Sequence, residues 1–313
     1  MSTGTPPQWP DLAARALGAS VVYANDELFA DRQNLIKAAD PVFQPGRFGN
    51  KGHIMDGWET RRRRQAGQDS AIVRLGAGGL VHRVVVDTTH FTGNYPPEVS
   101  VEGCGAEDYP SPAELAAAPW FTLVPRGPVK GDSRNEFEVA AAERITHVRL
   151  TIFPDGGVAR LRVYGEPVPD PRLLPGTIDL AAIENGAAVT GCSNMFYSSA
   201  GNLLLPGLAQ VMGDGWETSR RRDSEHDWVA VRLACAGSVE VVELDTSHFV
   251  GNAPGWGALG SDGGELLART ALHPDTRHQF AVPGGPVVTQ VRLDIYPDGG
   301  MARLRVRGTP TPA

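Results

Sequence analysis

The feature that most constrains this 313-residue sequence is an internal repeat that retains polar residues in order. Asp-Gly-Trp-Glu-Thr occurs at residues 56–60 and again at 214–218, a shift of 214 − 56 = 158, each time before an arginine-rich stretch. A duplication kept only for packing would need nothing beyond its apolar periodicity. The retained acids and arginines therefore indicate specific contacts, either in buried networks or at a site.

Two further blocks recur in the same order. Asp-Thr-x-His-Phe-x-Gly-Asn occupies residues 87–94 and 245–252, and Pro-Asp-Gly-Gly-x-Ala-Arg-Leu-Arg-Val occupies 154–163 and 297–306. The chain is long enough for two domains of about 150 residues. We expect an extended or disordered N-terminus (1–16), a first repeat (17–165), a proline-rich linker (166–176), a second repeat (177–308) and a tail (309–313).

Strand signals dominate both halves. Short runs rich in β-branched residues are bounded by glycine, proline and asparagine, whereas 112–118 is the best helical candidate. This pattern favours an all-β fold with one antiparallel sandwich per half, and it leaves the choice between a jelly roll and another sandwich topology open. The expected strands are 71–75, 82–86, 147–152, 159–164, 229–233, 240–244, 290–295 and 302–306.

The composition of the chain excludes several classes of function. The formal net charge of −7 argues against general nucleic-acid binding. The three cysteines form no CxxC pair, which fits a reducing compartment and provides no zinc signature. The sequence contains neither a membrane-spanning apolar stretch nor a signal-peptide core. We therefore expect a cytoplasmic protein without nucleic-acid or membrane partners.

Each repeated block has a structural interpretation beside its functional one. The first could be a salt-bridged loop that supports Trp58, and His90 could be a buried histidine bound by backbone groups. Asp87 would reach His90 only if the chain turned after Thr88. One aspartate and one histidine per half make a weak ligand set, so we predict no cofactor or metal, while a divalent metal is left open.

Taken together, the three blocks resemble the allantoicase family, as does the opening segment 26–30 with Asn34 and Leu35. The resemblance extends over about residues 20–308 and includes both repeats. It implies two jelly-roll sandwich domains of the galactose-binding type and a homo-oligomer. It also implies a hydrolase acting on a linear amidine-type C–N bond, which converts allantoate to ureidoglycolate and urea in purine and ureide catabolism.

This substrate carries one carboxylate and two ureido groups on a single carbon, which suggests roles for the retained residues. We expect Glu59 and His90 to act as acid and base, with Asp56 and Asp87 orienting them. Arginine suits a carboxylate, and an amide side chain suits a ureido group. The residues expected to bind substrate are Arg62, Arg160 and Asn94, with a second or supporting set of Glu217, His248, Asp214, Asp245, Arg220, Arg303 and Asn252.

The first repeat is favoured as the active one because it keeps Arg61 and Tyr95, where the second has Ser219 and Ala253. The sequence leaves open whether one or both repeats are competent, and whether water attacks directly or follows an elimination. The alternatives to this function are a non-catalytic tandem β-sandwich that binds a small molecule or glycan, and a metal-dependent hydrolase of another amide or ureide.

Overall fold

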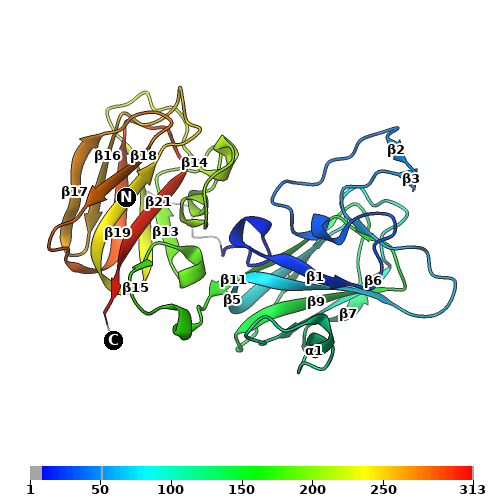
Figure 1. Cartoon of the computed structure of the whole chain (residues 1–313). Helices are drawn as coiled ribbons and strands as arrows, with labels where there is room; N and C mark the ends of the chain where they lie inside the picture. The colour runs from blue at the N-terminus through cyan, green and yellow to red at the C-terminus, as the bar shows by residue number, and fades with distance from the viewer. Residues whose placement is uncertain (1–8, 51, 312–313) are drawn as a thin grey trace. The chain divides into compact units, whose positions relative to one another are not determined.

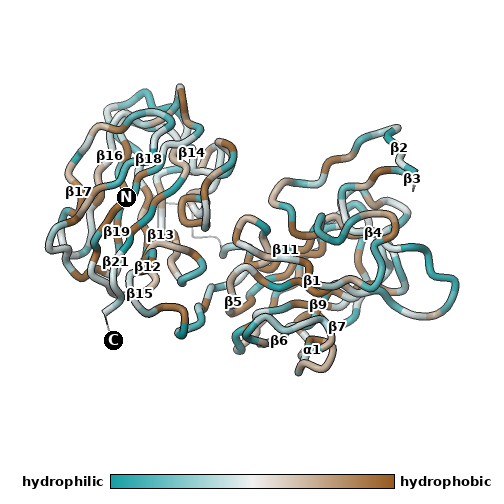
Figure 2. The backbone as a smooth tube through the Cα atoms, in the orientation of Figure 1, coloured by the Kyte–Doolittle hydropathy of each residue, from teal (hydrophilic) through white to brown (hydrophobic). Residues whose placement is uncertain are grey.

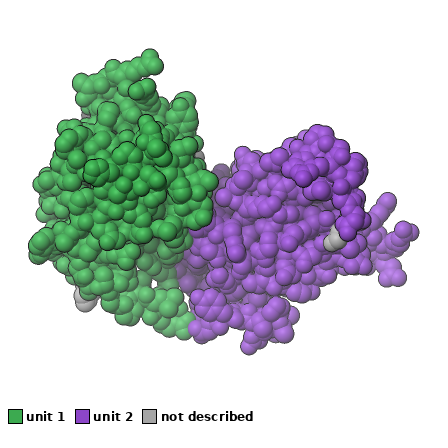
Figure 3. Space-filling model, turned by 45° about the horizontal axis from the view of Figure 1, so that its top comes forward, with its two compact units in different colours: residues 1–8, 169–313 green, residues 9–168 purple. Residues whose placement is uncertain are grey.

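The computed structural model describes residues 9–50 and 52–311 (Figure 1). The chain divides into two compact units, one spanning Trp9–Val168 and the other beginning at Pro169 (Figure 3). Part of the expected extended or disordered N-terminus, before Trp9, and the last two residues of the expected tail, 312–313, lie outside the described residues. Residues 9–16, in contrast, belong to the first unit, because Leu12 and Ala13 are fully buried and Leu12 N donates to Val163 O at 2.7 Å.

The first unit consists mainly of β-strands that pair antiparallel. Its helical segments are short, and α1 begins with a capping box between Ser111 and Glu114, at the predicted helix. The elements are η1 (Arg15–Leu17), β1 (Ser20–Ala24), η2 (Arg32–Ile36), β2 (Phe48–Gly49), β3 (Gly52–His53), β4 (Trp58–Glu59), β5 (Asp69–Asp87), β6 (Glu98–Cys104), α1 (Pro112–Ala116), β7 (Phe121–Pro128), β8 (Arg134–Glu138), β9 (Ile145–Phe153), β10 (Gly157–Val158) and β11 (Arg160–Pro167).

A single strand, β5, belongs to both layers of this sandwich. Its first half lies between β1 and β9, in the order β1-β5-β9-β6-β7, and its second half pairs with β11 and β8. The two predicted strands 71–75 and 82–86 are thus parts of one 19-residue strand. The glycines between them explain the error: a Cβ at Gly76 would lie 2.5 Å from Leu17 O, so they permit close backbone approach rather than ending the strand.

The second unit repeats this arrangement. Its 19-residue strand β15 pairs with β13 and β19 in its first half and with β21 and β18 in its second. The predicted all-β fold of two tandem jelly-roll sandwiches is confirmed. The elements are η3 (Pro171–Leu173), β12 (Ile178–Asp179), η4 (Ile183–Asn185), β13 (Ala188–Cys192), η5 (Ala200–Leu204), η6 (Met212–Asp214), β14 (Trp216–Glu217), β15 (Asp227–Asp245), β16 (Trp256–Ser261), β17 (Gly264–Ala271), β18 (Arg277–Ala281), β19 (Val287–Tyr296), β20 (Gly300–Met301) and β21 (Arg303–Pro310).

Apolar side chains from the strands form one core in each unit, and the hydrophobic colouring follows those strands in Figure 2. In β9, for example, Leu150 and Ile152 are fully buried. Trp58 and Trp216 are the largest fully buried side chains. No helix in the described part of the chain is long and apolar enough to cross a membrane.

Phe91 packs against the glycines of the other two repeated blocks. Its side chain is fully buried, and a Cβ built on Gly57 would lie 2.7 Å from the ring. A Cβ on Gly157 would overlap the ring directly, and Gly300 stands in the same relation to Phe249. These glycines are therefore required by close packing.

We expect Gly157→Ala to lower the free energy of unfolding of the first unit by about 1–3 kcal/mol, because the buried ring has no space to move into. Gly93→Ala is the matched control, since nothing lies within 4 Å of its added Cβ. Urea unfolding measures both variants. Equal stability of the two would contradict this account of the packing.

Candidate functional site

The three repeated blocks meet at the end of β5. Strand β4 of the first block pairs with β10 of the third, which places Gly157 opposite Glu59. The second block joins them through the backbone: Gly157 N donates to Asn94 O, and Ala159 N to Asp87 O, both at 2.7 Å. The second repeat forms the same junction between β14, β20 and the segment 245–252 at the end of β15.

The tryptophan of the first block supports this junction from inside the core. Trp58 Nε1 donates to Asp26 O at 2.8 Å, and Asn34 Nδ2 donates to Gly57 O at 2.9 Å. Trp216 Nε1 makes the equivalent bond to Asn194 O at 2.9 Å. Trp58 therefore has the supporting role that the structural interpretation of this loop assigned to it. The next residue, Glu59, is half-buried.

Arg160 lies in a buried network rather than on a solvated sheet face. Its side chain is 1% exposed and donates to Ala39 O, Ala159 O, Asp56 O and Asp56 Oδ2, the last at 2.7 Å. Burial alone would raise the pKa of Asp56, but hydrogen bonds from Arg160 and Lys37 outweigh burial and lower that pKa to about 2. Arg303 is likewise buried and donates to Asp214 O at 2.7 Å.

Asp87 and His90 lie close together in the sequence, but their side chains bind different partners. Asp87 Oδ1 accepts from Thr89 N at 2.8 Å, and the chain turns through a bond from Phe91 N to Thr88 O. His90 Nε2 lies 3.1 Å from Pro41 O. Because a carbonyl oxygen only accepts, Nε2 is the donor in this contact. His248 Nε2 lies 3.0 Å from Ala209 O in the same way.

Glu59 and Asn94 form the polar pair that faces outward at the junction. Asn94 Nδ2 donates to Glu59 Oε1 at 2.7 Å, and Asn252 donates to Glu217 Oε1 at the same distance. Burial raises the pKa of Glu59, while the Asn94 hydrogen bond and the charge of His53 oppose that rise. A carboxyl group with a raised pKa is suited to proton transfer near neutral pH.

Among the predicted substrate arginines, Arg62 and Arg220 have exposed side chains. Two residues beside Glu59 were missed. Phe29 is 42% exposed, and its N donates to Glu59 O at 3.2 Å. In the second repeat, the N of its counterpart Tyr197 donates to Glu217 O. Comparison of the repeats could therefore have identified Phe29 and Tyr197. The second missed residue, His53, lies in a segment that is not repeated.

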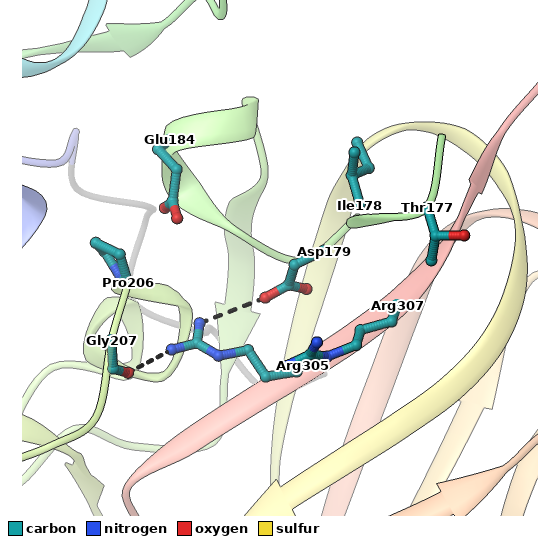
Figure 4. A pocket seen from close by; sticks show the side chains of 8 residues that line it. All are labelled: Thr177, Ile178, Asp179, Glu184, Pro206, Gly207, Arg305 and Arg307. Atoms are coloured by element: carbon teal, nitrogen blue, oxygen red, sulfur yellow. Dashed lines mark hydrogen bonds and ion pairs between the residues drawn. The ribbon is translucent and has the colours of Figure 1, made fainter. Parts of the chain in front are cut away.

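A separate cavity of about 230 Å³ lies in the second unit (Figure 4). Arg305 spans it, donating to Gly207 O at 2.8 Å and lying 3.4 Å from Asp179 Oδ2. Its lining includes none of the predicted site residues. Within residues 9–50 and 52–311, no group of three or more histidine, cysteine, aspartate or glutamate side chains is placed to hold a metal ion.

Comparison with known proteins gives a consistent result. A family model described as the allantoicase repeat matches residues 10–168 and 178–311. A probable allantoicase of Nocardia farcinica is 54% identical over 308 residues, covering 96% of this chain and 94% of that protein. One of Streptomyces coelicolor is 49% identical, covering 97% and 86%. The crystal structure of allantoicase from Saccharomyces cerevisiae is 35% identical, with a TM-score of 0.84, covering 96% of this chain and 92% of that one.

We expect Asp56→Ala to lower the free energy of unfolding by on the order of 3 kcal/mol, because it leaves the Arg160 guanidinium buried without its carboxylate. The lowered pKa of Asp56 means that this stabilisation is present above the ordinary aspartate pKa and is lost as the pH falls toward 2.

Asp214→Ala is the control for this prediction, because the Asp214 carboxylate accepts from the backbone N of Gln210 and Val211. Its loss should be about 1 kcal/mol. Denaturant unfolding at pH 7 and at pH 3 measures both variants. Equal losses, or a gap between them that widens at pH 3, would contradict the role given to the Asp56–Arg160 pair.

Proposed function

The chain belongs to the allantoicase family, and from this we infer that it hydrolyses allantoate to ureidoglycolate and urea. The observation that carries the inference is the match of both repeats to the family model, over nearly all of the described residues. The junction of the three blocks supports it, because it presents a carboxyl group and an amide side by side.

The reaction replaces one ureido group of allantoate with a hydroxyl group. A C–N bond breaks, the departing nitrogen gains a proton, and water adds to the same carbon after losing one. We propose Glu59 as one of the two groups that move these protons, with Asn94 holding both Glu59 and a ureido group. His90 is the repeated histidine available as the second group, through its Nδ1.

The remaining predicted residues take supporting roles in this proposal. Arg62 is exposed and suits the substrate carboxylate. The guanidinium of Arg160 is bound to Asp56, so we assign this pair to positioning the loop around Glu59. Asp87 positions the turn that precedes His90. The counterparts in the second repeat form a second or supporting set: Glu217, His248, Asp214, Asp245, Arg220, Arg303 and Asn252.

We further propose that the protein is cytoplasmic and that it needs no metal. From the family resemblance we also propose that it assembles as a homo-oligomer. Light scattering after size-exclusion chromatography tests the assembly, and a chelator tests the metal.

Purified protein incubated with allantoate should release urea and ureidoglycolate, and a chelator should leave the rate unchanged. Separate colorimetric assays distinguish urea from ammonia. Release of ammonia would point to hydrolysis of a different C–N bond. Well-folded protein that binds allantoate without turning it over would favour the non-catalytic binding module.

Glu59→Gln should lower kcat/KM by about 100-fold or more, because the amide cannot accept or deliver the proton. At neutral pH, the melting temperature of this variant should equal or exceed that of the wild-type protein. The folded pKa of Glu59 is raised, so its ionisation reduces stability as the pH rises through that pKa, and the amide avoids this loss.

The stability gained by the Gln variant should therefore grow with pH and vanish below the ordinary glutamate pKa. Glu217→Gln is the matched control, because Glu217 makes the same bond to an asparagine. Loss of activity in Glu217→Gln alone would move the active site to the second repeat.

A further inference from the structure

The cavity in the second unit lies beside strand β21, whose two faces differ in chemistry (Figure 4). Successive side chains of a strand point to opposite faces, so Arg305 and Arg307 share the face opposite the fully buried Leu304 and Val306. Asp179 of β12 pairs with Arg307, which places its side chain on the same face as that arginine. Charged side chains from two strands therefore line a cavity of about 230 Å³, several times the ~30 Å³ that one water molecule occupies in the liquid.

Two of these charged groups hold the wall of the cavity. Arg305 Nη2 donates to Gly207 O at 2.8 Å, and Arg305 Nη1 lies 3.4 Å from Asp179 Oδ2. Asp179 Oδ1 accepts from the backbone N of Ala181 and of Val306, both at 3.0 Å. The hydrogen-bonding capacity of this arginine and this aspartate is therefore largely used within the protein.

The other two charged groups of the lining have unmet needs. The carboxyl group of Glu184 points toward the guanidinium of Arg305 from the opposite wall (Figure 4), and its Oε2 is buried without a donor among residues 9–50 and 52–311. Burial raises the pKa of this carboxyl group. Arg307 is exposed and forms no hydrogen bond or ion pair with the described part of the chain. The cavity therefore offers a ligand one carboxyl acceptor and one fork of donors.

The first repeat retains the wall of this region. Arg162 Nη1 lies 3.4 Å from Asp11 Oδ2, the same distance that separates Arg305 from Asp179. Each of the two aspartates opens the sequence Asp-Leu-Ala-Ala, and each of the two arginines belongs to the repeated Arg-Leu-Arg-Val. The arginine–aspartate pair is thus common to both repeats.

The two groups with unmet needs are found in the second repeat alone. The residue five positions after the shared aspartate is Ala16 in the first repeat and Glu184 in the second. The residue two positions after the shared arginine is Tyr164 in the first repeat and Arg307 in the second. The fold of this region therefore requires neither Glu184 nor Arg307, which leaves both available for binding.

We propose that this cavity binds a small carboxylic acid that also carries N–H donors, such as an amino acid or a ureido acid. The Arg307 guanidinium binds the carboxylate of the ligand, and the Glu184 carboxyl group accepts from its N–H group. A ligand with only one of these groups would leave the other side chain without a partner. This binding is independent of the proposed hydrolysis of allantoate.

Isothermal titration calorimetry of the full chain with four probes tests the chemistry of the ligand. Glycine and hydantoate (N-carbamoylglycine) carry both a carboxylate and N–H donors, whereas acetate carries only the carboxylate and urea only the donors. Glycine or hydantoate should bind saturably. Acetate and urea should bind about 10-fold more weakly or worse, because each forgoes one hydrogen bond to a charged group.

Glu184→Ala and Arg307→Tyr test the place of binding. Both introduce the residue that the first repeat carries at the equivalent position, so both should keep the wild-type melting temperature in the absence of ligand. Each should weaken binding by about 10-fold or more. Arg62→Ala is the matched control, because Arg62 is also an exposed arginine but lies at the candidate site and outside this cavity.

The outcomes are distinct. Saturable binding that both cavity variants weaken supports the proposal; glycine alone then identifies an amino acid, and hydantoate alone a ureido acid. Binding of neither probe overturns it. Binding that persists in both cavity variants but is lost in Arg62→Ala places the ligand at the candidate site and overturns it as well. Acetate that binds as tightly as glycine, or weakening in only one cavity variant, contradicts the contact of the ligand with both side chains.

Discussion

The most deeply buried guanidinium of each repeat constrains everything around the candidate site. Arg160 and Arg303 are 1% and 3% exposed, and a buried charge is tolerated only when its donors are satisfied. The chain must therefore present carbonyl oxygens to them, which it does from Ala39 and Gly207. The segment that supplies Ala39 also carries Pro41, whose oxygen binds His90. The need to supply Arg160 with hydrogen-bond acceptors therefore determines the position of this loop and of His90.

The same requirement explains why a duplicated chain retains polar residues with a structural role together with polar residues that catalyse. Removing one partner of a buried ionic network destabilises the fold, so both repeats keep the network whether or not both catalyse. Retention alone therefore marks structural and catalytic residues equally. Positions where the repeats differ, such as the longer segment between Val42 and Asp56 in the first repeat, are the ones that can separate the two roles.

Much of the fold could be predicted from β-branched runs and their repetition, because period-2 patterning is a local property of the sequence. The union of two predicted strands in β5 could not, since it depends on which backbones approach Gly76 and Gly79. The repeated blocks indicated the site, but the partners of Asp56 and Asp87 depend on pairing with Arg160, which lies 160 − 56 = 104 and 160 − 87 = 73 positions away.

Strands β5 and β15 each pass through both layers of their sandwich, and this has a consequence for motion. Neither layer can separate from the other while its shared strand stays paired, so each repeat should open as a single cooperative unit in hydrogen exchange. Low-energy fluctuations are then left to segments outside that strand, such as the hairpin β2–β3. The fold thereby confines its freedom of movement to the loops and short strands around the end of β5, where the three repeated blocks meet.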